Sequence, residues 1–103
     1  MKKCQNILDV PTVTRITMTP SNTTLLRDSD VSLNCSTDAN PAAHLYYFYF
    51  IDTLIGNSSS GVFNVTVKAD GQYICVPINR VGTGHNATVS ITAVGEFTSD
   101  QTL

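Results

Sequence analysis

The sequence predicts an all-β fold, a sandwich or barrel of seven or eight short strands, and three observations carry this prediction. Short runs in which apolar and polar residues alternate recur along the whole chain, and such alternation is typical of half-buried strands. Clusters of turn-forming residues separate these runs. No stretch long enough to form a helix has apolar residues at helical spacing. Threonine, a β-branched residue that favours strands, occurs 14 times.

Eight runs are expected to form the strands, at the short spacing of a sandwich or barrel. They span residues 13–19, 23–26, 31–36, 45–51, 53–55, 62–67, 72–79 and 86–94. The first run ends at Pro20, and the polar segment 27–30 separates the second run from the third. The third run alternates cleanly, because Val31, Leu33 and Cys35 share one face when the chain is extended.

The later runs differ in character. A loop at residues 38–41 precedes the fourth run, which is almost entirely aromatic. A turn at residues 56–58 closes the short fifth run, and the sixth and seventh runs alternate. The turn at residues 82–84 leads into the last run, which alternates over nine residues.

Size, composition and charge limit the classes of protein. The chain has 103 residues and a mass of 11.1 kDa, which is enough for one domain. Leucine, isoleucine, valine and phenylalanine account for 28 residues, so a core can form. Charged residues make up only 14% and the net charge is −2, which argues against a nucleic-acid surface or a polybasic membrane patch. No apolar run approaches ~18 residues, so we expect no membrane insertion by this segment.

The ends of the chain fall outside the alternating pattern. We expect residues 1–10 and 95–103 to be tails or linkers and residues 11–94 to form the domain. The opening Met1-Lys2-Lys3 resembles the start of a signal peptide, but polar residues follow where the apolar stretch should be. This pattern favours one unit of a multi-domain protein whose signal peptide lies elsewhere.

Five Asn-X-Ser/Thr triplets, or sequons, favour an extracellular glycoprotein. The candidate glycosylation sites are Asn22, Asn34, Asn57, Asn64 and Asn86. Each triplet alone is weak evidence, but five exceed the number that eight asparagines and 23 serines and threonines give by chance. Asn34 is the weakest candidate, because a disulfide at the neighbouring Cys35 hinders glycan transfer. The alternative is that these residues are simply common in β turns.

Three cysteines fit an oxidising compartment. Cys35 and Cys75 each lie in an expected strand, 40 residues apart. Closing a loop of that length would contribute about 4 kcal/mol on the chain-entropy model. Cys4 is left over in the tail, where it can pair with another chain or domain or remain a free thiol.

Three motifs together resemble the immunoglobulin superfamily in its I-set or C2-like form. Residues 70–75, DGQYIC, place Tyr73 two residues before Cys75, where a tyrosine corner belongs. Residues 31–35, VSLNC, match the V-x-L-x-C form of the second strand. Residues 75–82 look like the C-x-x-x-N-x-x-G hairpin of adhesion-type domains.

The resemblance covers residues 11–94 and implies a two-sheet antiparallel immunoglobulin-like sandwich with one disulfide between the sheets. The implied disulfide and core positions are Cys35 with Cys75, Leu33, Tyr47, Gly71 and Tyr73. Pro77 departs from the pattern, because it lies in a run that should be a central strand. We therefore expect a bulge or an early strand end there.

Residues 45–50 provide the candidate partner surface. The chain has no tryptophan, and Tyr47 stands where the family has its core tryptophan. If Tyr47 points inward, alternation places three aromatic side chains on the outer face of the sheet, those of Tyr46, Phe48 and Phe50. Such a patch is typical of a partner surface. The alternative is a register shift that buries these rings, or cover by a neighbouring domain.

Enzymatic chemistry finds no support in the residue pattern. The sequence has no nucleophile–base pair, no paired carboxylates and no Cys/His cluster with metal-ligand spacing. His44 and His85 lie in expected loops without acidic neighbours. We expect no enzyme, no metal and no cofactor.

The expected function is protein recognition at the cell surface. The resemblance implies an extracellular module of an adhesion molecule or receptor that binds another protein, including a second copy of itself. Two alternatives stay open: a passive spacer in a long ectodomain or matrix protein, and an intracellular structural module of the same fold. An intracellular module would have reduced cysteines and unused sequons.

Overall fold

Eight strands in two sheets make up the computed structural model, which describes residues 9–39 and 41–95. The strands are β1 (Thr14–Thr19), β2 (Thr24–Leu26), β3 (Asp30–Thr37), β4 (Leu45–Phe50), β5 (Thr53–Ser58), β6 (Val62–Thr66), β7 (Gly71–Ile78) and β8 (Ala87–Val94). Each overlaps one of the expected runs, and the described residues contain no helix. The expected all-β fold is confirmed.

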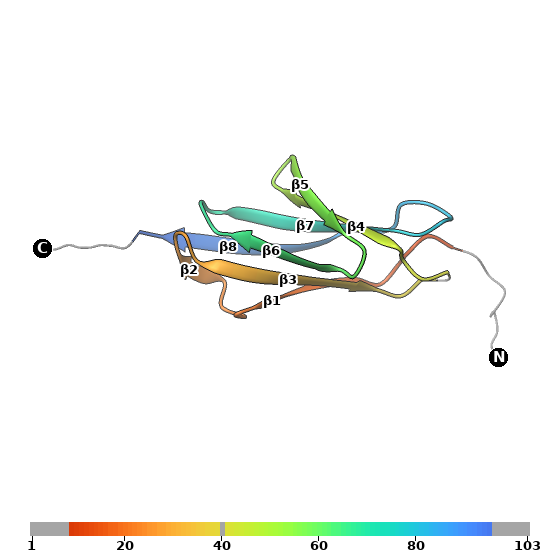
Figure 1. Cartoon of the computed structure of the whole chain (residues 1–103), viewed down its shortest axis with the longest axis horizontal. Helices are drawn as coiled ribbons and strands as arrows, with labels where there is room; N and C mark the ends of the chain where they lie inside the picture. The colour runs from red at the N-terminus through yellow and green to blue at the C-terminus, as the bar shows by residue number, and fades with distance from the viewer. Residues whose placement is uncertain (1–8, 40, 96–103) are drawn as a thin grey trace, which may run out of the picture.

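The two sheets pack face to face as the layers of a sandwich (Figure 1). One sheet has the strand order β1-β3-β6 and the other has the order β2-β8-β7-β4-β5. Neighbouring strands are antiparallel except β2 and β8, which are parallel. After β1 the chain passes to the second sheet across the Thr19–Pro20 peptide, which is cis. The architecture is thus an open sandwich rather than a closed barrel.

The core is centred on the disulfide between Cys35 of β3 and Cys75 of β7. Each cysteine lies on the central strand of its sheet, and their Cα atoms are 6.3 Å apart. Leu33, two positions before Cys35 on the same face, is fully buried. Phe48 of β4 is also fully buried and stacks on Phe63 of β6, with 5.0 Å between the ring centroids. The expected inter-sheet disulfide is confirmed, whereas Cys4 lies outside the described residues.

The face of β4 that we expected on the outside of the sheet points into the core. Tyr46 is 9% exposed, Phe48 is 0% exposed and Phe50 packs against the core. Tyr47 and Tyr49 lie on the outer face instead, where both are partly exposed. The prediction that Tyr46, Phe48 and Phe50 form a partner surface is therefore wrong, and so is the inward position of Tyr47.

The composition of β4 explains the error. Its sequence, LYYFYF, has an apolar or aromatic side chain at every position, so no polar residue marks the outer face. Pairing with β7 sets the direction in the folded domain. Phe48 lies opposite Cys75, and the disulfide fixes Cys75 in the core. Phe48 and every second residue of β4 must then point inward.

Strand β7 continues through Pro77 to Ile78 in regular register with β4, which corrects the expected strand end. Pairing between β7 and β8 stops at Cys75, so Pro77 lies beyond the ladder on that side. Its carbonyl accepts a hydrogen bond of 2.9 Å from the N–H of Gly84, and no strand needs the N–H that proline lacks. The pairing of β7 with the chain before β8 shifts by one residue between the Cys75–Ala87 pair and the Ile78–Thr83 bridge. A further register shift lies between β4 and β5, at Phe48 and Tyr49.

Asn79, directly after β7, joins three segments at one end of the sandwich. Its side chain is almost fully buried, at 2% exposed. The amide nitrogen donates to the carbonyls of Asp9 (2.6 Å) and Pro41 (2.9 Å). The amide oxygen accepts from the N–H groups of Val81 (2.9 Å) and Gly82 (3.1 Å). One side chain thus holds the entering chain, the loop after β3 and the β7–β8 turn together.

Replacing this asparagine should be costly. We expect Asn79→Ala to lower the free energy of unfolding by about 2–4 kcal/mol, because four backbone groups lose a buried partner. Urea denaturation measures the change. Gln72→Ala, an exposed position on β7, serves as the control and should change stability by less than about 0.5 kcal/mol. A similar small effect at Asn79 would contradict the role given to it.

Tyr73 of β7 is buried, with only 4% of its surface exposed. This agrees with its place two residues before Cys75 in the sequence motif. Its ring contacts Phe50, with 4.8 Å between the centroids. Gly71 permits this packing, because the Phe50 ring fills the space that a β-carbon at Gly71 would need. Burial raises the pKa of the Tyr73 hydroxyl above its usual value of 10.0, since the phenolate anion is poorly solvated there.

The raised pKa gives stability a predictable dependence on alkaline pH. Above pH 10.0 the unfolded chain loses the Tyr73 proton while the native domain keeps it. The unfolded state then binds fewer protons, so stability falls as pH rises through this window. We expect the urea midpoint to decline above pH 10.0 and to decline less in Tyr73→Phe. Lys68, whose pKa is also raised through its hydrogen bond to Asp28, is present in both proteins. Equal declines would contradict the prediction.

Candidate functional site

The outer face of the five-stranded sheet carries a patch of aromatic and apolar side chains over β4, β5 and β7. We call it the β4–β7 patch. Its members are Tyr47, Tyr49, Leu54, Ile74 and Val76. Leu54 is 51% exposed and the others are partly exposed.

Strand register arranges the patch in two rows. Tyr47 lies opposite Val76 of β7, and Tyr49 lies opposite Ile74. On the other side of β4, Leu54 of β5 pairs with Tyr49. Cross-strand neighbours on one face have β-carbons about 4.5–5.5 Å apart, so the side chains of each row lie against one another. The side chains of the patch are all uncharged.

The outer face of the other sheet is polar. Thr17 of β1 lies opposite Asn34 of β3, and Ser32 lies opposite Asn64 of β6. Val62, at 44% exposed, is the large apolar side chain of this face. The two outer faces of the sandwich therefore differ in chemistry.

All five sequon asparagines have exposed side chains, as a glycan requires. Asn34 and Asn64 lie on the polar face, on β3 and β6. Asn57 lies on β5, Asn86 directly precedes β8, and Asn22 lies between β1 and β2. Whether these asparagines carry glycans stays a prediction.

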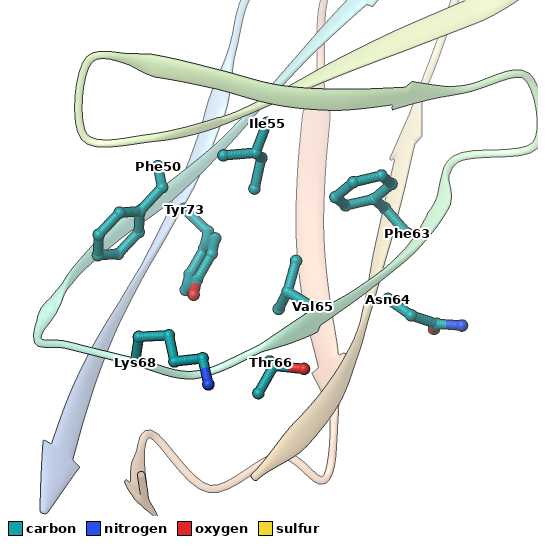
Figure 2. Close-up of a pocket in the computed structure, with 8 residues that line it drawn as sticks. All are labelled: Phe50, Ile55, Phe63, Asn64, Val65, Thr66, Lys68 and Tyr73. Atoms are coloured by element: carbon teal, nitrogen blue, oxygen red, sulfur yellow. The ribbon is translucent and has the colours of Figure 1, made fainter. Parts of the chain in front are cut away.

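A hollow of about 340 Å³ opens between β5 and β6 (Figure 2). Its lining residues are Phe50, Ile55, Phe63, Asn64, Val65, Thr66, Lys68 and Tyr73. Figure 2 shows the Tyr73 hydroxyl pointing into it, and within the described part of the chain that hydroxyl has no hydrogen-bond partner. The Lys68 ammonium is held by Asp28 at 2.6 Å. The hollow combines apolar walls with one buried hydroxyl and lacks a nucleophile–base pair.

Metal and membrane features are lacking from residues 9–39 and 41–95. No three of their histidine, cysteine, aspartate and glutamate side chains gather closely enough to hold a metal ion. His44 and His85 are exposed. No helix in this part of the chain could cross a membrane.

Sequence reasoning missed most of the β4–β7 patch. It located the aromatic strand but assigned the wrong face of it, so Tyr47 was expected in the core. A signal was present in β7, where Ile74 and Val76 alternate with Tyr73 and Cys75. A strand that is apolar on both faces is covered on both faces or exposes an apolar surface.

Comparison with known proteins gives a family and a fold. A sequence model described as immunoglobulin domain matches residues 14–93. No curated protein sequence matches the chain. A superoxide reductase (neelaredoxin) from Ignicoccus hospitalis is similar in structure, with a TM-score of 0.65, 12% sequence identity and 82% of each chain covered.

Two further solved structures share the fold. The PKD domain of a peptidase from a Thermoplasmatales archaeon has a TM-score of 0.60 and 18% identity, over 84% of this chain and 98% of that domain. A mutant of FN3tt has a TM-score of 0.58 and 20% identity, over 82% of this chain and 97% of its own. At such identities these likenesses establish the architecture and carry no chemistry to this chain.

The family match extends from the start of β1 almost to the end of β8. It agrees with the two-sheet sandwich and with the disulfide between the central strands. The chain therefore belongs to the immunoglobulin domain family.

Proposed function

We propose that this immunoglobulin domain is an extracellular protein-recognition module of a cell-surface adhesion molecule or receptor, with the β4–β7 patch as its contact surface. The observation that carries the proposal is the gathering of Tyr47, Tyr49, Ile74 and Val76 on one outer face while the other outer face is polar. Aromatic side chains contribute strongly to binding at protein interfaces. Domains of this family typically bind proteins and lack enzymatic activity.

The extracellular setting is supported by the disulfide and by the sequons. Disulfides such as Cys35–Cys75 persist in oxidising compartments. All five sequon asparagines are exposed, so none needs the domain to unfold for modification.

A second copy of the same chain suits the patch. The side chains of the patch are uncharged, so no like charges among them oppose each other when two copies meet face to face. A two-fold axis would place Tyr47 and Tyr49 of one copy against the same patch of the other. We therefore propose homophilic adhesion, in which two copies of the domain bind each other through this patch.

A passive spacer is the second candidate, and one observation favours it. The described chain enters at one end of the sandwich and leaves at the opposite end (Figure 1), as a unit strung between neighbouring domains would. A spacer binds nothing through the patch. An intracellular structural module would in addition need reduced cysteines and unmodified sequons.

Sedimentation velocity over a concentration series separates these candidates. For the chain expressed through a secretory pathway we expect a concentration-dependent dimer. The double variant Tyr47→Ser/Tyr49→Ser should abolish that dimer, because it removes both aromatic rings of the patch.

The matched control is Val62→Ser, which removes an exposed apolar side chain from the opposite face. It should leave the dimer unchanged. A monomer at all concentrations would overturn homophilic recognition and favour the spacer. Equal loss of the dimer in both variants would overturn self-association through this face.

Glycan occupancy tests the extracellular part of the proposal. We expect the secreted chain to carry glycans at Asn22, Asn57, Asn64 and Asn86, and lower occupancy at Asn34 because Cys35 beside it is held in the disulfide. Mass spectrometry after enzymatic release of the glycans reads each site. Secretion with all five sites unmodified would count against a glycoprotein.

A further inference from the structure

Asn57 lies directly opposite Tyr47 in the β4–β5 pair. The next pair, Phe48 with Gly56, faces the core, because Phe48 is fully buried and a β-carbon on Gly56 would meet the Phe63 ring. Asn57 and Tyr47 must then both point outward. Their β-carbons are about 4.5–5.5 Å apart at such a position. Asn57 is exposed and Tyr47 is partly exposed, so the two side chains are within reach of each other above the sheet.

The sequon asparagine Asn86 directly precedes β8 and lies outside the β7–β8 ladder, which ends at the Cys75–Ala87 pair. The strand pairs place Asn57 in the row of Tyr47 and Val76. The other row of the patch, with Leu54, Tyr49 and Ile74, continues to Thr88 of β8 and contains no sequon asparagine.

The chemistry of an N-linked sugar on Asn57 suits contact with the neighbouring Tyr47 ring. The first residue of such a glycan is N-acetylglucosamine, whose pyranose ring presents several C–H bonds on one face. These weakly positive hydrogens are attracted to the negative face of an aromatic ring. Contact between the two flat faces also removes apolar surface from water. Asn64 on the polar face lacks this possibility, because its cross-strand neighbour is Ser32.

We propose that a glycan on Asn57 lies over the Tyr47 ring, stabilises the folded domain and removes Tyr47 from the contact surface. A partner of the glycosylated domain then reaches only the row with Leu54, Tyr49 and Ile74. The glycosylation state of Asn57 thereby selects how much of the β4–β7 patch is available. This inference rests on the proposed function, but the contact between sugar and ring can be tested without any partner.

The first test is a thermal unfolding cycle on the secreted chain, trimmed enzymatically to one N-acetylglucosamine at each site. We expect Asn57→Gln to lower the melting temperature by about 2–6 °C when Tyr47 is present. The same substitution should have no effect in the Tyr47→Ser background, and Tyr47→Phe should behave like the parent. Asn64→Gln is the matched control and should leave the melting temperature unchanged.

Several outcomes would overturn the contact between sugar and ring. These are an equal effect of Asn57→Gln in both backgrounds, no effect in either, or an unoccupied Asn57 in a protein whose other sequons are modified. The last result leaves the extracellular function intact. An absence of glycans at all five sites would instead refute the extracellular setting itself.

The second test measures self-association by sedimentation velocity. With Asn57 glycosylated, Tyr49→Ser should weaken association by about tenfold or more, the effect of losing an aromatic ring at the centre of an interface. Tyr47→Ser should leave association unchanged in that form and weaken it comparably once Asn57→Gln removes the glycan. Weakening by Tyr47→Ser in the glycosylated form would overturn the masking of Tyr47. If the protein never associates, homophilic recognition is refuted. The thermal unfolding measurements still test the contact between the Asn57 glycan and the Tyr47 ring.

Discussion

The disulfide between the central strands of the two sheets is the constraint on which the rest of the structure depends. Cys75 must face the core to reach Cys35, and this sets the direction of every side chain on β7. Register carries the constraint sideways to β4, where Phe48 lies opposite Cys75. From there it reaches β5, where Gly56 pairs with Phe48 and Asn57 must face outward. One covalent bond thus determines both the core and the exposed patch.

The sequence predicted the architecture well because most strands show their two faces. In β3, Val31, Leu33 and Cys35 mark the inner face, and the motif around Cys75 in β7 indicates the family. Strand β4 could not be predicted in the same way. With six apolar or aromatic residues in a row its inner face depends on pairing with β7, and pairing is a long-range property. The error shifted the assignment by one residue, so the outer face was assigned to Tyr46, Phe48 and Phe50, which point into the core.

One outer face of the sandwich is mainly polar and the other is apolar, because side chains alternate between the two faces of each strand. On the β1-β3-β6 sheet, the cross-strand neighbours of Asn34 are Thr17 and Val62, and that of Asn64 is Ser32. Apart from Val62, these side chains are polar and compatible with glycans and with water. On the larger sheet the outward positions of β4 and β7 are aromatic or β-branched. Stability of the sandwich requires apolar residues on the inner faces only. The apolar outer face of β4 and β7 is therefore a feature that folding alone does not explain.

The β4–β5 hairpin adds a local cost at the edge of this face. Ile51 at its tip has a φ of 58°, in the left-handed region that suits glycine or asparagine. A β-branched residue there costs about 1–2 kcal/mol, and 51% of Ile51 is exposed, so burial returns little of that cost. The hairpin also carries Leu54, which pairs with Tyr49 in the row without a sequon asparagine. A strained apolar tip on the hairpin that carries Leu54 is what selection for contact, rather than for stability, would produce.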